Sequence, residues 1–178
     1  DAVHAHQRPK LERYDDMLFA VVKTVHYDDS PTTGASEVVE TGEVMVFVGP
    51  NYVLTVRHGE HGGLRGMRKR METQSDMLAL GPSVVLYGIL DVAVDGYLSV
   101  SAALQEDIDE VETAVFAGGS RGADTNRMYR LKRDVLALRR SAPPLSGAVL
   151  ARADQPPPLV AEDTHEYFRD VHAHLAHV

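Results

Sequence analysis

The hydrophobic pattern of this 178-residue chain changes its period once, near residue 64. Before that point, β-branched, aromatic and other apolar residues gather in short runs such as Met17–Val25 and Glu43–Val48, which is typical of strands. From Leu64 onward, apolar residues recur with a helical period. A chain that begins with strands and continues with long helices must bury both kinds of apolar face together, so the pattern predicts an α/β fold.

The first third of the chain predicts three strands. A third run, Tyr52–Arg57, follows the second run across the short loop Gly49-Pro50-Asn51, so we expect these two strands to be antiparallel. Tyr27–Ser36 lies between the first and second runs and is rich in Asp, Ser, Pro and Gly. That composition indicates an exposed loop within one domain.

The remainder of the chain predicts a series of helices, beginning with a short basic helix over Leu64–Thr73. Pro82 suits a first helical turn and opens a helix of about 35 residues that ends near Gly118-Gly119. The second half of this helix is acidic, and the long helix expected after the loop Gly118–Asp124 is basic. We therefore expect an antiparallel helical hairpin with opposite charges facing across its flanks.

Prolines and the C-terminal pattern complete the helical region. Pro143-Pro144 is expected to break or kink the second long helix. A last helix is predicted from about Asp163 to Val178, where the apolar period continues to the end of the given sequence.

Charge and composition exclude several classes of function. With 26 acidic and 18 basic residues, the net charge is −8, so general binding to nucleic acid is not expected. The chain has no cysteine, which excludes disulfide scaffolds and thiolate chemistry and favours a cytoplasmic location. The most apolar stretch, Val84–Leu104, is interrupted by Asp91, Asp95 and Gly96, so we do not expect it to span a membrane.

The last predicted helix carries a candidate metal site. Glu166, Asp170 and His174 are spaced by four residues, which places them on one helical face, and a carboxylate and an imidazole there could share a divalent ion. A hard ion such as Mg²⁺ would favour Asp170 over His174. The alternative is an exposed polar stripe that binds nothing. Asp91 in the long apolar helix is either an ordinary salt-bridge or capping residue, or faces a seam between chains.

A second motif points to a different class of protein. Gly118-Gly119-Ser120-Arg121-Gly122 matches the G-x-S-x-G elbow of serine hydrolases, and Asp134 and His165 follow in the order that a triad requires. The elbow needs a strand before its serine, whereas the residues before Ser120 have a helical period. A small serine hydrolase using Ser120 is therefore the alternative function, and a loop between two helices is the reading that the period favours.

Three segments taken together resemble a known family. His6-Gln7-Arg8-Pro9-Lys10, Tyr129-Arg130-Leu131-Lys132-Arg133-Asp134 and Tyr167-Phe168-Arg169-Asp170-Val171 look like the cytoplasmic region of CorA-type magnesium transporters, in the same order and at similar separations. The similarity covers essentially the whole chain. It implies an α/β/α sandwich with a mixed sheet, two long antiparallel helices and the start of a stalk helix that continues into the membrane.

The resemblance also implies a function, a domain division and a set of ligands. Residues 1–161 would form a regulatory domain on the cytoplasmic side of the cell membrane, and residues 162–178 would begin the stalk. The chain would sense Mg²⁺, with Co²⁺ as a second candidate, would not be an enzyme, and would assemble as a homopentamer. The regulatory sites between subunits would use Asp1 with Asp170, and Asp91 with His174.

Several parts of the family's pattern are not in this sequence. The Gly-Met-Asn pore motif, the two membrane helices and the opening strands expected before Asp1 are absent, so we expect that this stretch does not itself conduct ions. A zinc-exporting or cobalt-transporting relative is an open alternative, because metal specificity would reside largely in the pore.

Overall fold

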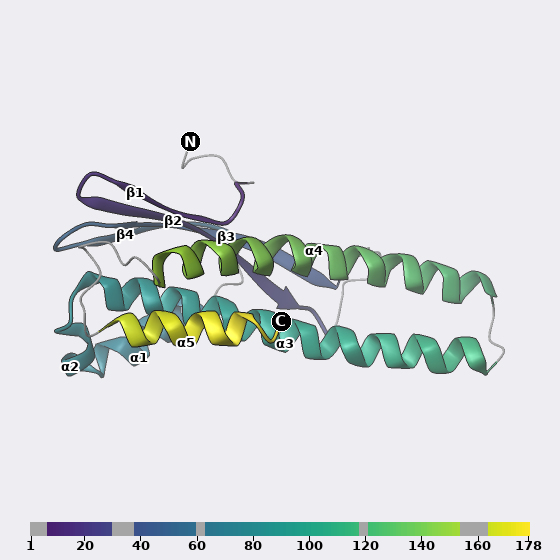
Figure 1. Cartoon of the computed structure of the whole chain (residues 1–178). Coiled ribbons are helices and arrows are strands. Elements are labelled where there is room, and N and C mark those ends of the chain that lie inside the picture. Colours follow the sequence, from purple (N-terminus) through teal and green to yellow (C-terminus); the bar gives the residue numbers. More distant parts are fainter. Residues whose placement is uncertain (1–6, 30–37, 60–62, 118–120, 154–163) are drawn as a thin grey trace.

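A computed structural model describes residues 7–29, 38–59, 63–117, 121–153 and 164–178 of the chain (Figure 1). Strands come first and helices follow, as the change of period predicts. The elements are β1 (Lys10–Tyr14), β2 (Met17–Tyr27), β3 (Val39–Val48), β4 (Val53–His58), α1 (Leu64–Glu72), α2 (Ser75–Leu78), α3 (Pro82–Phe116), α4 (Arg121–Ala153) and α5 (His165–Leu175).

The described strands form one sheet in the order β1-β2-β3-β4, and every neighbouring pair is antiparallel. The predicted antiparallel pairing of the second and third runs is confirmed in β3 and β4. The mixed sheet that the resemblance implied is not found among these four strands. Each connection between these strands is shorter than the crossover of a dozen or more residues that a parallel neighbour needs, which favours antiparallel pairing.

Strand β1 was not predicted. It contributes a buried Leu11 and turns into β2 through Asp15 and Asp16, where Asp15 adopts a positive φ of 48°. Arg13 Nε donates to the Asp15 carbonyl oxygen at 2.9 Å, which closes this turn. An Asp-Asp pair is a usual residue choice for a tight hairpin turn, because aspartate tolerates the left-handed region.

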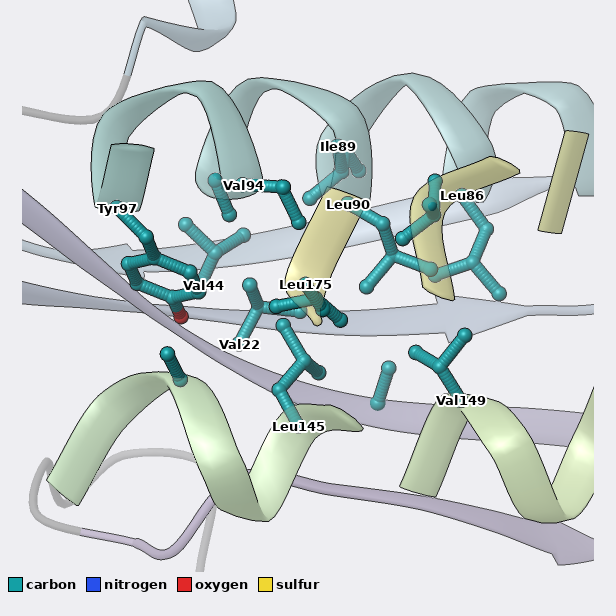
Figure 2. Close-up of a cluster of buried hydrophobic side chains, with 14 of the residues drawn as sticks. Val22, Val44, Leu86, Ile89, Leu90, Val94, Tyr97, Leu145, Val149 and Leu175 are labelled. Atoms are coloured by element: carbon teal, nitrogen blue, oxygen red, sulfur yellow. The ribbon is translucent and has the colours of Figure 1, made fainter. Parts of the chain in front are cut away.

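The main core lies between one face of the sheet and the helices. Leu18, Ala20 and Val22 on β2 belong to it together with residues from α1, α3, α4 and α5. Figure 2 shows side chains of α3 and α4 pointing toward one another, with Leu175 of α5 among them. Tyr97 is fully buried there, and its hydroxyl donates to the Lys23 carbonyl oxygen at 2.5 Å.

All the described helices that join this core pack on the same face of the sheet. The opposite face carries a smaller cluster of Phe19, Val21 and Met45, and no residue from a described helix belongs to it. The α/β class is therefore confirmed. In the described part, however, the layers are sheet and helices rather than helices on both sides, because the five helices follow β4 without a return to a further strand.

Helices α3 and α4 form the predicted antiparallel hairpin, whose far end extends beyond the sheet (Figure 1). Arg127 of α4 pairs with Glu110 of α3 and lies 3.7 Å from the Asp107 carboxylate. The expected pairing of opposite charges across the flank is confirmed at this position. Asp107 also accepts a hydrogen bond of 2.8 Å from the Tyr27 hydroxyl at the end of β2, which joins the hairpin to the sheet.

Of the break or kink predicted at Pro143 and Pro144, the break is wrong, because α4 runs through both residues; the kink stays a prediction. A proline at these positions removes the hydrogen bond to the carbonyl four residues earlier. Those carbonyls belong to Arg139 and Arg140, which are exposed, so water can reach them. Leu145 and Val149, beyond the prolines, are fully buried and hold the helix against the core.

Among the described helices, only α3 is long and apolar enough by composition to cross a membrane. In the fold, 56% of its most apolar window is buried. It packs against β2, α4 and α5, as expected for the central helix of a core.

Candidate metal centre

Helices α3 and α5 bring together acidic residues that lie far apart in the sequence. The two helices contact each other and run in the same direction (Figure 1). On α5, Phe168, Val171 and Leu175 are buried, so the helical period turns Asp170 outward. The buried face of α5 thus fixes where its polar residues lie along α3.

A pair of tyrosines aligns the two helices one turn before the carboxylates. The rings of Tyr87 and Tyr167 have centroids 4.9 Å apart, with 38° between their planes. Asp91 follows Tyr87 by four residues and Asp170 follows Tyr167 by three, so each aspartate lies over the next turn of its own helix. This arrangement places both carboxylates on neighbouring turns of the same surface.

The carboxylate of Asp91 is in an unfavourable electrostatic position. Burial is the main cause that raises its pKa above the ordinary value of 3.8, and the negative charge of Asp95, with a smaller effect of Asp170, acts in the same direction. Arg70 of α1 and His174 of α5 oppose this shift in pKa. Burial together with the charges of Asp91 and Asp170 likewise raises the pKa of Tyr87. The positive groups therefore offset only part of the negative charge.

Asp170 and His174 form the predicted pair on one face of α5. His174 Nε2 lies 3.7 Å from Asp170 Oδ1, and their side chains are 46% and 56% exposed. Both groups can therefore meet a ligand or a neighbouring molecule. Helix α5 ends at Leu175, short of the predicted Val178, so His177 lies in the turn that follows.

The structure describes three of the four residues predicted to bind metal. Asp91, Asp170 and His174 lie close enough that their charges act on one another. Asp1 lies outside the described residues. In the part of the chain that the structure describes, no three His, Asp or Glu side chains converge tightly enough to hold a metal ion alone. The donors suit a hard divalent cation, but further ligands are needed to complete its coordination.

We did not predict from the sequence that Arg70, Met67 and Met71 contribute to this surface. Arg70 was seen only as one of several basic residues in Leu64–Thr73, although packing of α1 on α3 brings its charge near Asp91. Met67 and Met71 make this packing possible because they face Gly88, where even a Cβ atom would lie 3.0 Å from Met71 Sδ. An alternation of exposed arginines with buried methionines was the available signal.

The residues of the hydrolase hypothesis do not have the context that an elbow requires. Ser120 lies outside the described residues, and the element before it is helix α3 rather than a strand. Asp134 is buried, and its Oδ1 accepts a hydrogen bond of 3.2 Å from the backbone N–H of Val39. This carboxylate therefore anchors α4 to β3.

Two curated proteins are similar in sequence to almost the whole chain. YfjQ of Bacillus subtilis strain 168 is 29% identical over 169 residues, which are 95% of this chain and 50% of that protein. The cobalt/magnesium transport protein CorA of Thermotoga maritima is 26% identical over 179 residues, covering 100% of this chain and 49% of that protein. The chain spans about half the length of these curated relatives.

A solved structure shares the fold over almost the whole chain. The soluble domain of CorA from Methanocaldococcus jannaschii matches with a TM-score of 0.75 at 16% identity, over 96% of this chain and 66% of that one. The sequence model for the family described as CorA-like Mg²⁺ transporter protein matches residues 1–178. The chain belongs to the CorA-like Mg²⁺ transporter family.

Proposed function

We propose that this chain is the regulatory, Mg²⁺-sensing domain of a CorA-like divalent cation channel, on the cytoplasmic side of the cell membrane. Divalent ions bind between neighbouring copies of a homopentamer and stabilise its closed state. Asp91, Asp170 and His174 contribute from one copy, and Asp1 contributes to the ion that Asp170 binds. The chain does this by binding alone and catalyses no reaction.

The observation that carries this proposal is the half-buried carboxylate of Asp91 on a surface that α3 shares with α5, close enough to Asp95 and Asp170 for their charges to act on it. A carboxylate in that position destabilises the fold when it is ionised, and a bound divalent cation relieves both the desolvation and the repulsion from Asp95 and Asp170. Such an ion binds more tightly to the assembled state, in which more ligands surround it, and therefore favours assembly.

The incomplete ligand set supports a site between copies. Among the described residues, one chain offers carboxylates and an imidazole without a complete coordination shell. A second copy supplies the remaining ligands if its acidic surface meets this one. Without metal, the two surfaces carry charges of the same sign and repel each other.

Names of similar proteins agree with the substrate class. The relative from Thermotoga maritima is called a cobalt/magnesium transport protein. Mg²⁺ is the cargo that we propose for the longer protein, with Co²⁺ as a second one.

The test is the assembly state measured by sedimentation velocity, first in EDTA and then at increasing Mg²⁺. We expect the average mass to rise with Mg²⁺ and Asp170→Asn to weaken this response. Glu112→Gln is the matched control, since it removes an exposed carboxylate of α3 about 30 Å along the helix from Asp91. An Asp170→Asn variant that keeps the full response would contradict the proposal.

A further inference from the structure

A pocket opens where the last strand of the described sheet passes the first helices. β4 stands at one end of the order β1-β2-β3-β4, so only one of its edges pairs with a described strand. A cavity of about 640 Å³ is lined by Val53 and Thr55 of β4 together with side chains of α1, α2 and α3. We call it the β4 pocket. Neither Asp91 nor Asp170 lines it, so it is separate from the candidate metal centre.

The register of β4 determines which of its backbone groups point away from the sheet. The backbone N–H of Gly49 donates to the Tyr52 carbonyl oxygen at 2.9 Å, which makes these two a hydrogen-bonded pair. Bonded and non-bonded pairs alternate along an antiparallel ladder, so β4 bonds to β3 through every second residue, starting at Leu54. Within the described residues, the backbone groups between them take part in no hydrogen bond. These outward groups belong to Val53, Thr55 and Arg57.

Apolar side chains form the wall of the β4 pocket. Met67 and Met71 of α1 are buried at this wall, and Leu78 of α2 lines it with 37% of its surface exposed. Successive side chains of a strand point to opposite faces, so a strand added beside β4 turns every second side chain toward the pocket. The pocket therefore suits an extended chain that carries apolar residues at alternate positions.

The surface beside the β4 pocket is basic in a chain whose net charge is −8. Arg65, Arg68 and Lys69 are exposed on α1, and Arg57 is exposed near the end of β4. Among the residues that line the pocket, Arg68 is paired with Glu72 at 2.8 Å. The excess of positive charge favours an acidic occupant. It disfavours a second copy of this chain, because pairing two β4 edges would bring two basic helices together.

We propose that β4 binds an extended, acidic peptide segment of a partner protein as an additional strand. The peptide backbone pairs with the outward groups of Val53, Thr55 and Arg57, because an extended chain presents donors and acceptors at the spacing of an edge strand. Its apolar side chains at alternate positions fill the β4 pocket. Carboxylates that flank these apolar positions meet Arg57 and the basic residues of α1.

The first test is fluorescence anisotropy with the labelled synthetic peptide Glu-Glu-Val-Thr-Val-Thr-Val-Glu-Glu, in EDTA so that metal plays no part. We expect saturable binding that weakens by about tenfold in Thr55→Pro, which removes one outward N–H from an edge strand, where proline is tolerated. Thr55→Val keeps this N–H and is the matched control, which we expect to bind like the wild type. Absence of saturable binding, or an equal loss in both variants, overturns the proposal.

The role of the pocket and of charge is tested separately. Leu78→Glu places a negative charge in the pocket and should weaken binding of the acidic peptide by about tenfold or more. Met128→Glu is its control, because Met128 is 45% exposed on α4 and does not line the pocket. A peptide with lysine in place of each glutamate should also bind more weakly. Equal binding of the two peptides would overturn the proposal of an acidic partner.

Two measurements on the wild type avoid any dependence on how the variants fold. In ¹H–¹⁵N spectra recorded during the peptide titration, we expect the shifted amides to cluster along 53–57 and 64–72, and shifts centred elsewhere would overturn the proposal. Sedimentation without peptide tests the other occupant of the edge. A dimer that forms in EDTA and is lost in Thr55→Pro would assign the edge to a second copy and overturn the proposal of a peptide partner.

Discussion

Replacing Leu145 tests whether α4 packs on the core beyond its two prolines. Leu145 is 0% exposed and lies with Val22 and Leu175 in the cluster of Figure 2. Leu145→Ala removes three buried carbon atoms, which corresponds to about 2.4 kcal/mol at about 0.8 kcal/mol each. The cavity that remains raises the expected loss in the free energy of unfolding to about 3–4 kcal/mol.

Thermal unfolding followed by circular dichroism measures this loss. For a chain of this size, about 3 kcal/mol lowers Tm by roughly 6–12 °C. Val135→Ala is the control on the same helix, because Val135 is 39% exposed and its truncation should change stability by less than about 0.5 kcal/mol. If Leu145→Ala lowered Tm no more than Val135→Ala, the helix would not pack on the core past Pro144.

Two further predictions concern ionisable groups. Asp91→Asn should raise Tm in EDTA at neutral pH and have little effect near pH 3, which is about one unit below the ordinary pKa. The pKa of Asp91 is raised on folding, so this carboxyl group favours the fold only below its unfolded-state pKa, and that contribution is lost as pH rises through its folded-state pKa. A lower Tm of the variant at neutral pH would show that the ionised carboxylate is stabilising. Burial, followed by the hydrogen bond to Asp107, raises the pKa of Tyr27 from 10.0 to about 12. The contribution of Tyr27 to the free energy of unfolding is therefore complete below its unfolded-state pKa and is lost as pH rises toward its folded-state pKa. Tyr27→Phe should therefore make the alkaline loss of stability smaller in chemical denaturation between these two values, and an unchanged pH profile would count against the Tyr27–Asp107 interaction.

Local signals in the sequence were sufficient to predict the ends of elements where a proline or a glycine determines the backbone conformation. Pro82 and the glycines near 118 mark the ends of α3, and the loop Gly49-Pro50-Asn51 marks the hairpin of β3 and β4. β1 was not predicted from the sequence because it is short and its strand pattern rests on one buried side chain, Leu11. Its pairing with β2 and its packing against α4, neither of which shows in the local sequence, stabilise it.

The continuation of α4 through Pro143 and Pro144 could not be predicted from local signals. Two prolines in a helix interior disfavour it, and the tertiary burial of residues such as Leu145 and Val149 offsets this cost. The same limit applies to the candidate site. Spacing alone places Asp170 and His174 on one face, but the approach of Arg70 and of Tyr87 depends on how α1, α3 and α5 pack.

The proposed function requires that divalent cations prefer the surface formed by Asp91 and Asp170 over the other acidic residues of the chain. Paramagnetic Mn²⁺, a hard ion that also favours oxygen ligands, reveals this preference through the broadening of ¹H–¹⁵N amide signals at substoichiometric metal. We expect broadening centred on residues around Asp91, Asp170 and His174, and its loss in Asp170→Asn. Equal broadening around remote carboxylates such as Glu112 and Asp16, unchanged in that variant, would contradict it.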